Sequence, residues 1–179
     1  MRLIAWKLVA LAAVVACSAL VVPGGAVAQR DTRGSSVSAL ERGVLAEINA
    51  TRRQHGLHAL RFSVRLAAAA NQHSGAMAQR GFFAHDSADG TPFWKRVRRY
   101  YTASSYRYWS VGENLLWASP EVDAASALNM WMHSPEHKKI LLTGEWREVG
   151  ISAVHTTSAP GAYGGREVTI VTADFGVRR

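Results

Sequence analysis

The chain has 179 residues, a formal net charge of +8 and a single cysteine, Cys17. One cysteine excludes an internal disulfide and a zinc site built from several thiolates. The positive charge favours anionic partners such as wall phosphopolymers, lipid headgroups or nucleic acid, and charge alone does not choose among them.

The first 28 residues have the pattern of an export signal. Arg2 and Lys7 form a basic start, an apolar run follows over 8–22, and an A-x-A cleavage site lies at 26–28. The apolar run is short for a membrane span, which needs about 20 residues. The sequence therefore predicts a signal peptide over 1–28 and a secreted protein with no transmembrane segment after cleavage.

Cys17 leaves a second interpretation of the same segment open. The residues before it, Val14-Val15-Ala16, loosely match those before a bacterial lipid-modified cysteine, so the alternative is a chain anchored by lipid at Cys17. Cleavage after residue 28 removes two basic residues, lowers the formal charge to +6 and leaves a chain without cysteine. Such a domain depends on its hydrophobic core, for which about 150 residues are sufficient.

A polar segment separates the export signal from the expected domain. Residues 29–37 predict a linker, and the domain is expected over 38–179. Ser38 and Glu41 form a capping box that starts the first helix, and apolar residues follow at helical spacing. Gly56 is suited to end that helix.

The middle of the chain predicts three more helices. The first begins after Ser63, runs to about Arg80 and is followed by Gly81. Two Thr-Pro or Ser-Pro pairs then resemble an N-cap followed by proline at the first helical position. They predict helices at about 92–101 and 120–133.

The last third of the chain changes from helical to strand periodicity. Ser134 and Pro135 repeat the capping pattern and open a short helix with His137 in its first turn. The stretches 148–155 and 167–175 are β-rich and joined by a Pro/Gly loop, which predicts a long hairpin. Helices first and strands last indicate an α+β domain.

Large apolar residues on the inward period of each element are expected to form the core. They are Leu45, Ile48, Leu66, Met77, Phe82, Leu115, Trp131, Ile140, Ile151 and Phe175.

Three separated segments carry side chains that can bind a proton or a metal: FFAH at 82–85, GEN at 112–114 and WMHSPEHKKIL at 131–141. His85 follows two aromatic residues and opens onto a turn-rich loop, which suits a ligand or a proton-transfer group. Local sequence alone fits a surface-loop histidine better. Glu113 lies next to a glycine, and three roles are open for it: it accepts a proton, it orients an imidazole, or it only caps or braces the turn.

His137 has the most informative local sequence. With Ser134 as the N-cap, it is the third residue of its helix, where free N–H groups and positive potential favour a neutral, metal-binding imidazole. The alternative is a helix-start histidine that only hydrogen-bonds its neighbours.

In order and spacing, the three segments resemble the CAP superfamily (cysteine-rich secretory, antigen 5, pathogenesis-related 1), in particular its bacterial secreted branch. The resemblance implies a three-layer α-β-α sandwich with a central antiparallel sheet. It also implies a cleft lined by two histidines and one or two glutamates. By this resemblance, His85 corresponds to the first histidine, Glu113 to the first glutamate and His137 to the second histidine.

One position departs from the family pattern. Animal and plant members usually have a second glutamate three residues after the helix tryptophan, and that position after Trp131 is Ser134 here. Glu136 either supplies the missing catalytic carboxylate or only stabilises the helix dipole.

The run KRVRR at 95–99 is followed closely by tyrosines and a tryptophan. Basic residues interleaved with aromatics bind nucleic acid or glycans in some proteins, but such a run is more often a solvated helix face. Trp94 and Val97 are expected to point inward.

Two functions remain open from the sequence, which does not decide whether the protein is an enzyme. In the first, His85 and His137 bind zinc or another divalent metal and the cleft hydrolyses a wall-associated substrate such as peptidoglycan. In the second, the domain is a non-enzymatic binding module for lipid, glycan or anionic wall polymer. A third option, nuclease activity, ranks low because the chain has no clustered acidic triad, and nucleic acid is not the expected partner.

Overall fold

This computed structural model describes residues 38–179, which belong to one unit of the chain. The predicted signal peptide, the linker over 29–37 and Cys17 lie outside the described residues. No helix among residues 38–179 is long and apolar enough to cross a membrane.

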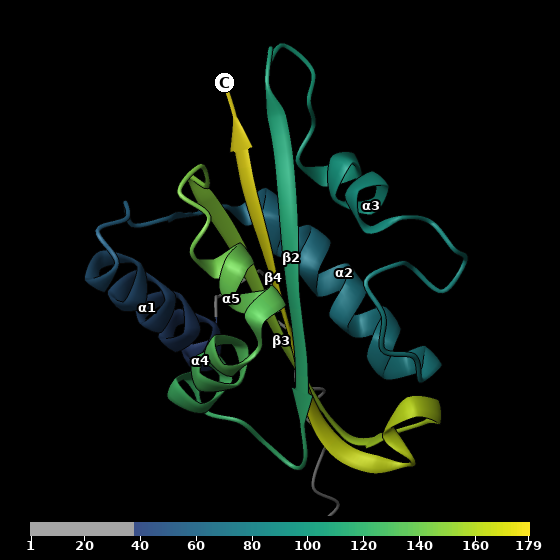
Figure 1. The fold of residues 1–179 in the computed structure, drawn as a ribbon. Helices are drawn as coiled ribbons and strands as arrows, with labels where there is room; N and C mark the ends of the chain where they lie inside the picture. The colour runs from purple at the N-terminus through teal and green to yellow at the C-terminus, as the bar shows by residue number, and fades with distance from the viewer. Residues whose placement is uncertain (1–37) are drawn as a thin grey trace, which may run out of the picture. The chain divides into compact units, whose positions relative to one another are not determined.

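A four-stranded sheet forms the centre of the fold, with the strand order β1-β3-β4-β2 (Figure 1). Its strands are β1 (Arg61–Phe62), β2 (Trp109–Ala118), β3 (Glu148–Ala159) and β4 (Arg166–Arg178). The three long strands are antiparallel, whereas the two-residue β1 pairs in parallel with β3. The predicted hairpin is therefore confirmed, while β1 and β2 were not predicted as strands.

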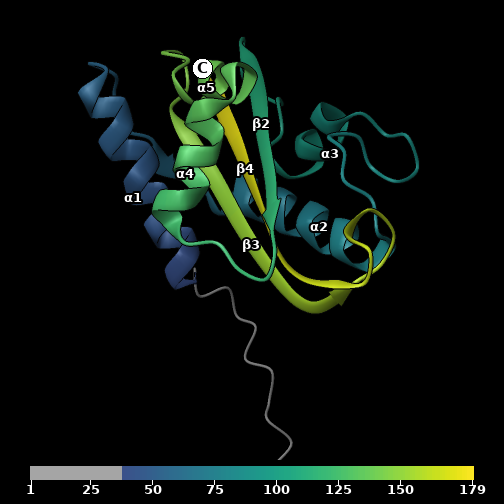
Figure 2. The same cartoon turned by 60° about the horizontal axis from the view of Figure 1, so that its bottom comes forward.

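Helices cover both faces of this sheet, which confirms the predicted three-layer α+β sandwich (Figures 1 and 2). On one face lie α1 (Ala39–Gln54), α4 (Ala124–His133) and α5 (Pro135–Leu141). On the other face lie α2 (Val64–Arg80) and α3 (Phe93–Tyr100). Helices α3 and α5 both contact β2, each from a different face of the sheet.

The predicted start of the first helix is present. Ser38 Oγ accepts from the Glu41 backbone N–H at 3.2 Å, and the Glu41 carboxylate accepts from the Ser38 N–H at 2.6 Å. Helix α2 ends at Gly81, whose φ of 69° is accessible to glycine at little cost.

The predicted start of the fourth helix is wrong. Strand β2 continues to Ala118, and α4 begins only after Asp123, whose carboxylate accepts from the Ser126 N–H at 2.7 Å. Aspartate and serine are equally good N-caps, so Asp123 can start the helix in place of the predicted Ser119.

The core has two parts, one on each face of the sheet, and alternate residues of β4 contribute to both. Val171, Ala173 and Phe175 face α1, α4 and α5, whereas Val168 and Ile170 face α2. Seven of the ten predicted core residues are buried, and Leu45, Phe82 and Ile140 are partly buried.

Candidate functional site

The candidate site lies at β2, which is an edge strand of the described sheet. Successive residues of a strand point to opposite faces, so Glu113 and Asn114 diverge. Glu113 bonds to α3, and the Asn114 side-chain N–H donates to the backbone carbonyl of His137 in α5 at 3.0 Å. Strand β2 thus contacts the His85 segment through Glu113 on one face of the sheet and the His137 segment through Asn114 on the other.

Glu113 is the centre of a buried polar cluster. Its side chain is 0% exposed, and its two oxygens bind different partners. Oε2 forms an ion pair with the guanidinium of Arg96, which is 1% exposed, and Oε1 lies 2.9 Å from His85 Nδ1. A buried carboxylate needs such a partner, because an unpaired charge away from water is very costly.

The contact with Glu113 fixes the tautomer of His85. An ion-paired carboxylate only accepts hydrogen bonds, so Nδ1 carries the hydrogen and Nε2 of the neutral ring has a free lone pair. The His85 side chain is 51% exposed, and no described residue bonds to Nε2. The arrangement presents one basic nitrogen to solvent in a defined orientation.

The backbone of the segment 82–85 is also held in place. Three of its carbonyls each accept a hydrogen bond from a buried side chain: from Tyr163 Oη at 2.9 Å, His73 Nε2 at 2.8 Å and Arg96 at 2.8 Å. His73 is therefore a packed structural residue of α2. These contacts make the position of His85 depend on α2, α3 and the loop between β3 and β4.

His137 lies on the other side of β2 and is partly buried. Its Nδ1 is 2.7 Å from Ser134 Oγ, which binds the ring instead of capping the helix. Burial lowers the pKa of His137, and a positive charge on His85 lowers it further, while Glu136 opposes the shift. The two imidazoles are thus within electrostatic reach of each other.

A second carboxyl group lies beside Glu113. Asp174 of β4 is paired with Glu113 in the strand register and is fully buried. Neither of its oxygens has a hydrogen-bond donor among the described residues, and the neighbouring Glu113 carboxylate can accept a hydrogen bond from Asp174 only when Asp174 is protonated. Burial, and next the negative charge of Glu113, raise the pKa of Asp174 well above its ordinary value, although Arg96 opposes this. The neutral acid is therefore favoured at this position.

The structure brings most of the predicted site residues into one region. His85 and Glu113 are in direct contact, and His137 lies within electrostatic reach of His85. Glu136 is exposed and affects the region through its charge. Within residues 38–179, no three His, Cys, Asp or Glu side chains are grouped so that they could hold a metal ion.

Arg96 and Asp174 are part of this cluster and were not predicted. Arg96 was assigned to a solvated helix face with the rest of its basic run, whereas Trp94, which was expected inside, is 40% exposed. Helical spacing places Arg96 on the same side as Phe93 and Val97, so the sequence already indicated that Arg96 faces the core. Asp174 is the one acid in the stretch 168–177 of β4, which is otherwise free of charged residues and thus marks an unusual position.

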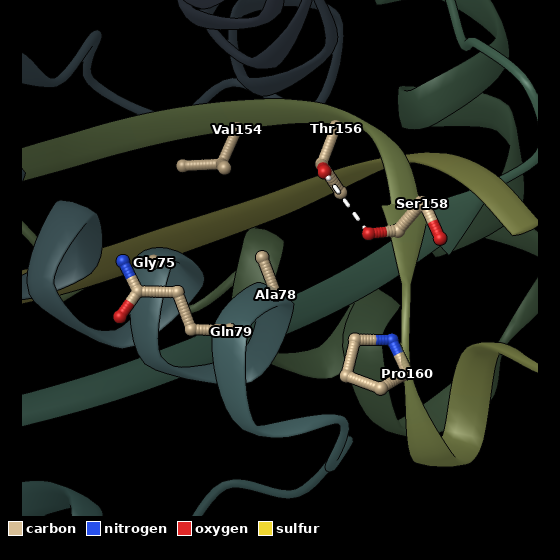
Figure 3. Close-up of a pocket in the computed structure, with 7 residues that line it drawn as sticks. All are labelled: Gly75, Ala78, Gln79, Val154, Thr156, Ser158 and Pro160. Carbon is tan, nitrogen blue, oxygen red and sulfur yellow. Dashed lines mark hydrogen bonds between the residues drawn. The ribbon is translucent and has the colours of Figure 1, made fainter. Parts of the chain in front are cut away.

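A separate groove of about 320 Å³ lies between α2 and β3 (Figure 3). It is lined by Gly75, Ala78, Gln79, Val154, Thr156, Ser158 and Pro160. None of these side chains is ionisable, so the groove has no group that could transfer a proton and is not part of the histidine site.

Comparison with known proteins finds a relative of similar sequence. The uncharacterized protein YkwD of Bacillus subtilis (strain 168) is 30% identical over 125 residues, which cover 69% of this chain and 46% of the relative. The chain thus spans less than half the length of that protein.

Two solved structures share the fold. An extracellular protein containing an SCP domain from Bacillus anthracis is 25% identical with a TM-score of 0.59, over 77% of this chain and 40% of that one. An outer surface protein of Borrelia burgdorferi is 20% identical with a TM-score of 0.64, over 81% of this chain and 97% of that one. The model of CAP, the cysteine-rich secretory protein family, matches residues 45–175. Because this match covers most of the chain, the protein belongs to the CAP family.

Proposed function

We propose that this protein acts outside the cytoplasm at a bacterial cell envelope, and that His85 is the proton-transfer group of a hydrolytic cleft. The observation that carries the chemistry is the contact of His85 Nδ1 with buried Glu113, which leaves Nε2 without a partner among residues 38–179 on a half-exposed side chain. The envelope location is supported by the predicted export signal and by a similar protein described as extracellular.

The proposed mechanism uses His85 first as a base and then as an acid. Nε2 accepts a proton from water while the water oxygen bonds to the scissile centre of a wall-associated substrate. Glu113 stabilises the resulting imidazolium, as the orienting carboxylate of a catalytic histidine does. The Nε2–H then donates its proton to the leaving group, which restores the neutral ring.

His137 contributes in its neutral form. Because its pKa is lowered, its ring stays uncharged at neutral pH and can hydrogen-bond a polar substrate group. Glu136 is a second carboxylate at the exposed end of the same helix turn, and its role in catalysis is proposed only as an electrostatic one.

The test is release of soluble fragments from isolated bacterial cell walls. His85→Gln is expected to lower the rate by about 10²- to 10⁴-fold, the usual contribution of a general acid–base group. His133→Gln is the matched control, because His133 is an exposed histidine bonded to its own helix at Asn129. Equal rates for wild type and His85→Gln would refute the role of His85.

A divalent metal such as zinc is a second proposal for the same histidines. In His85 and His137 the Nδ1 atom is engaged and Nε2 is free, as in many metal-ligating histidines. The fit is incomplete, because catalytic zinc usually has three protein ligands and Glu113 is already bound to Arg96. A metal there would lower the pKa of bound water.

Zinc titration of tag-free protein by calorimetry tests this second proposal. One zinc per chain is expected for the wild type, with loss of binding in both His85→Ala and His137→Ala. Binding that persists in both variants would place the metal elsewhere.

The third candidate is a non-enzymatic binding module. The buried ion pair of Glu113 and Arg96 is compatible with this function, because it can stabilise the β2 edge without taking part in catalysis. Association with cell walls that persists without any release of fragments, and that is unaffected by His85→Gln, would support this module over the hydrolase.

A further inference from the structure

Helix α3 has two chemically different sides. Its inner side carries Arg96 and Val97, which are buried, and Arg96 is committed to Glu113. Its outer side carries Trp94, Lys95, Arg98 and Arg99, which line a hollow of about 360 Å³. We call this hollow, with its four lining residues, the α3 hollow. The helix lies at the periphery of the fold (Figures 1 and 2).

The cations of the α3 hollow are not neutralised within the described chain. Helix α3 contains no acidic residue, and Lys95, Arg98 and Arg99 form no ion pair with any acid among residues 38–179. Asp89 feels the charge of Arg99 without pairing with it. Three unpaired charges around one hollow attract a polyanion and concentrate it there.

Arginine side chains lie over the aromatic rings of the segment that follows α3, while Tyr106 and Tyr108 stay 42% and 37% exposed. Arg98 lies 6.0 Å from the centre of the Trp109 ring, and Arg178 lies 4.9 Å from that of Tyr106. Arg179 similarly lies 4.7 Å from the Tyr108 ring centre. Trp94 is the aromatic residue of the hollow itself, is 40% exposed and has Lys95 Nζ at 5.4 Å from its ring centre.

This pattern distinguishes between classes of polyanion. Binding of single-stranded nucleic acid uses several open aromatic faces for successive bases, and here arginines lie over the neighbouring rings. Binding to a bilayer surface uses protruding apolar side chains, whereas this surface is hollowed and Trp94 is its one large apolar residue. A narrow chain of phosphates with small units between them needs neither feature.

We propose that the α3 hollow is a binding site for a phosphodiester-linked polyol or glycan chain of the cell wall. Arg98, Arg99 and Lys95 bind successive phosphates, and Trp94 packs against the unit between them. Because Arg96 hydrogen-bonds the His85 carbonyl from the inner side of α3, the histidine site lies across this helix from the bound polymer. The inference rests on the envelope location proposed above and not on the cleft chemistry.

The test measures binding of delipidated poly(glycerol phosphate) by calorimetry across a range of salt concentrations. The triple variant Lys95→Gln/Arg98→Gln/Arg99→Gln is expected to flatten the slope of log K against log salt by about two, as for loss of three contacts to a flexible chain. Trp94→Ala is expected to weaken binding about five-fold with the slope unchanged. Both variants leave the inner side of α3 intact, which circular dichroism verifies.

The matched control removes three charges from the other face of the sheet, with Arg53→Gln/Lys138→Gln/Lys139→Gln. It is expected to keep the wild-type slope, and an equal loss there would refute a defined site in favour of diffuse net charge. Tighter binding to anionic phospholipid vesicles, or to single-stranded DNA of equal charge, would also refute the proposal. His85→Gln is expected to bind the polymer normally, so failure of the cleft mechanism and failure of this site are separate results.

Discussion

Arg96 connects three features of the site through one guanidinium group. It forms the ion pair with Glu113, donates to the carbonyl of His85 at 2.8 Å and lies near Ser87 Oγ at 3.4 Å. Arginine suits this task because its planar group donates in several fixed directions, which lysine cannot reproduce. The orientation of His85 therefore depends on a residue from another element that never contacts its ring.

Loss of Arg96 is predicted to be strongly destabilising. Arg96→Ala leaves the buried carboxylate of Glu113 without its cation, and the expected loss of unfolding free energy is about 3–5 kcal/mol. Arg98→Ala on the same helix removes an exposed guanidinium and is expected to stay within about 0.5 kcal/mol of wild type. Urea unfolding measures both, and similar losses in the two variants would contradict the buried role.

Asp174 is predicted to make the protein less stable as pH rises. Its folded pKa is raised, so above the unfolded value of about 3.9 the native state binds more protons than the unfolded state. Unfolding free energy then falls with pH by up to about 1.4 kcal/mol per unit until the raised pKa is reached.

Asp174→Asn removes this titration and keeps the shape of the side chain. The variant is expected to be more stable than wild type at neutral pH and to show a flatter profile in urea unfolding between pH 4 and 8. A wild type that instead gains stability over the variant as pH rises would show that Asp174 is charged in the fold.

At the scale of elements, the helices are held to the sheet by large side chains on one face and by close backbone approach on the other. Trp131 of α4 is 1% exposed, and its Nε1–H donates to the Leu115 carbonyl of β2 at 3.1 Å. Helix α2 instead approaches β3 closely at Gly150, where side-chain atoms would not fit.

Trp131→Ala is predicted to cost about 3–5 kcal/mol, because it leaves a large cavity under α4. The neighbouring Met130 is 45% exposed, and Met130→Ala is expected to change stability by less than about 0.5 kcal/mol. Chemical unfolding of the pair distinguishes the two faces of the helix. A loss below about 1 kcal/mol for Trp131→Ala would mean that the buried face is misassigned.

Two glycine substitutions are predicted to change the unfolding free energy in opposite directions. A Cβ at Gly150 would lie 1.9 Å from the Ala67 backbone nitrogen, so Gly150→Ala must separate α2 from β3 and should cost at least about 1–3 kcal/mol. A Cβ at Gly75, within α2, would meet nothing within 4 Å. Gly75→Ala is expected to stabilise by about 0.5–1 kcal/mol through helix propensity. Thermal unfolding tests both, and a neutral Gly150→Ala would contradict the close approach.

At the scale of the whole domain, one strand joins the two parts of the core. Alternate residues of β4 pack against α1, α4 and α5 on one face and against α2 on the other. Glu113 lies on the edge strand β2 and Asp174 on its neighbour β4, so the candidate site also depends on the pairing of these two strands. Loss of either layer would expose the apolar side of β4.

The domain is therefore predicted to unfold in a single cooperative transition. Far-UV circular dichroism and tryptophan fluorescence should give coincident urea curves, as expected for a two-state domain of this size. Trp146 reports on one layer and Trp117 on the other. Separate transitions for variants that retain only one of these two tryptophans would show that the layers unfold independently.

The sequence by itself determined the local features of this protein. The capping box at Ser38, the glycine end of α2, the start of α5 at Pro135 and the terminal hairpin depend on neighbouring residues, whose preferences act over a few positions. The resemblance of the His and Glu segments to a known family also implied the three-layer arrangement. The actual cap of α4 at Asp123 escaped prediction because two capping residues competed nearby.

Only the tertiary structure decided which charges are buried and what they bind. Arg96 lies within a basic run and Asp174 within an otherwise uncharged stretch of β4, and no local rule pairs either with Glu113, which is 17 residues from Arg96 along the chain. Their contacts exist because α3 packs against β2 and because β2 pairs with β4. Burial in that packing removes water from the three groups, and the loss of water both requires the ion pair and raises the pKa of Asp174.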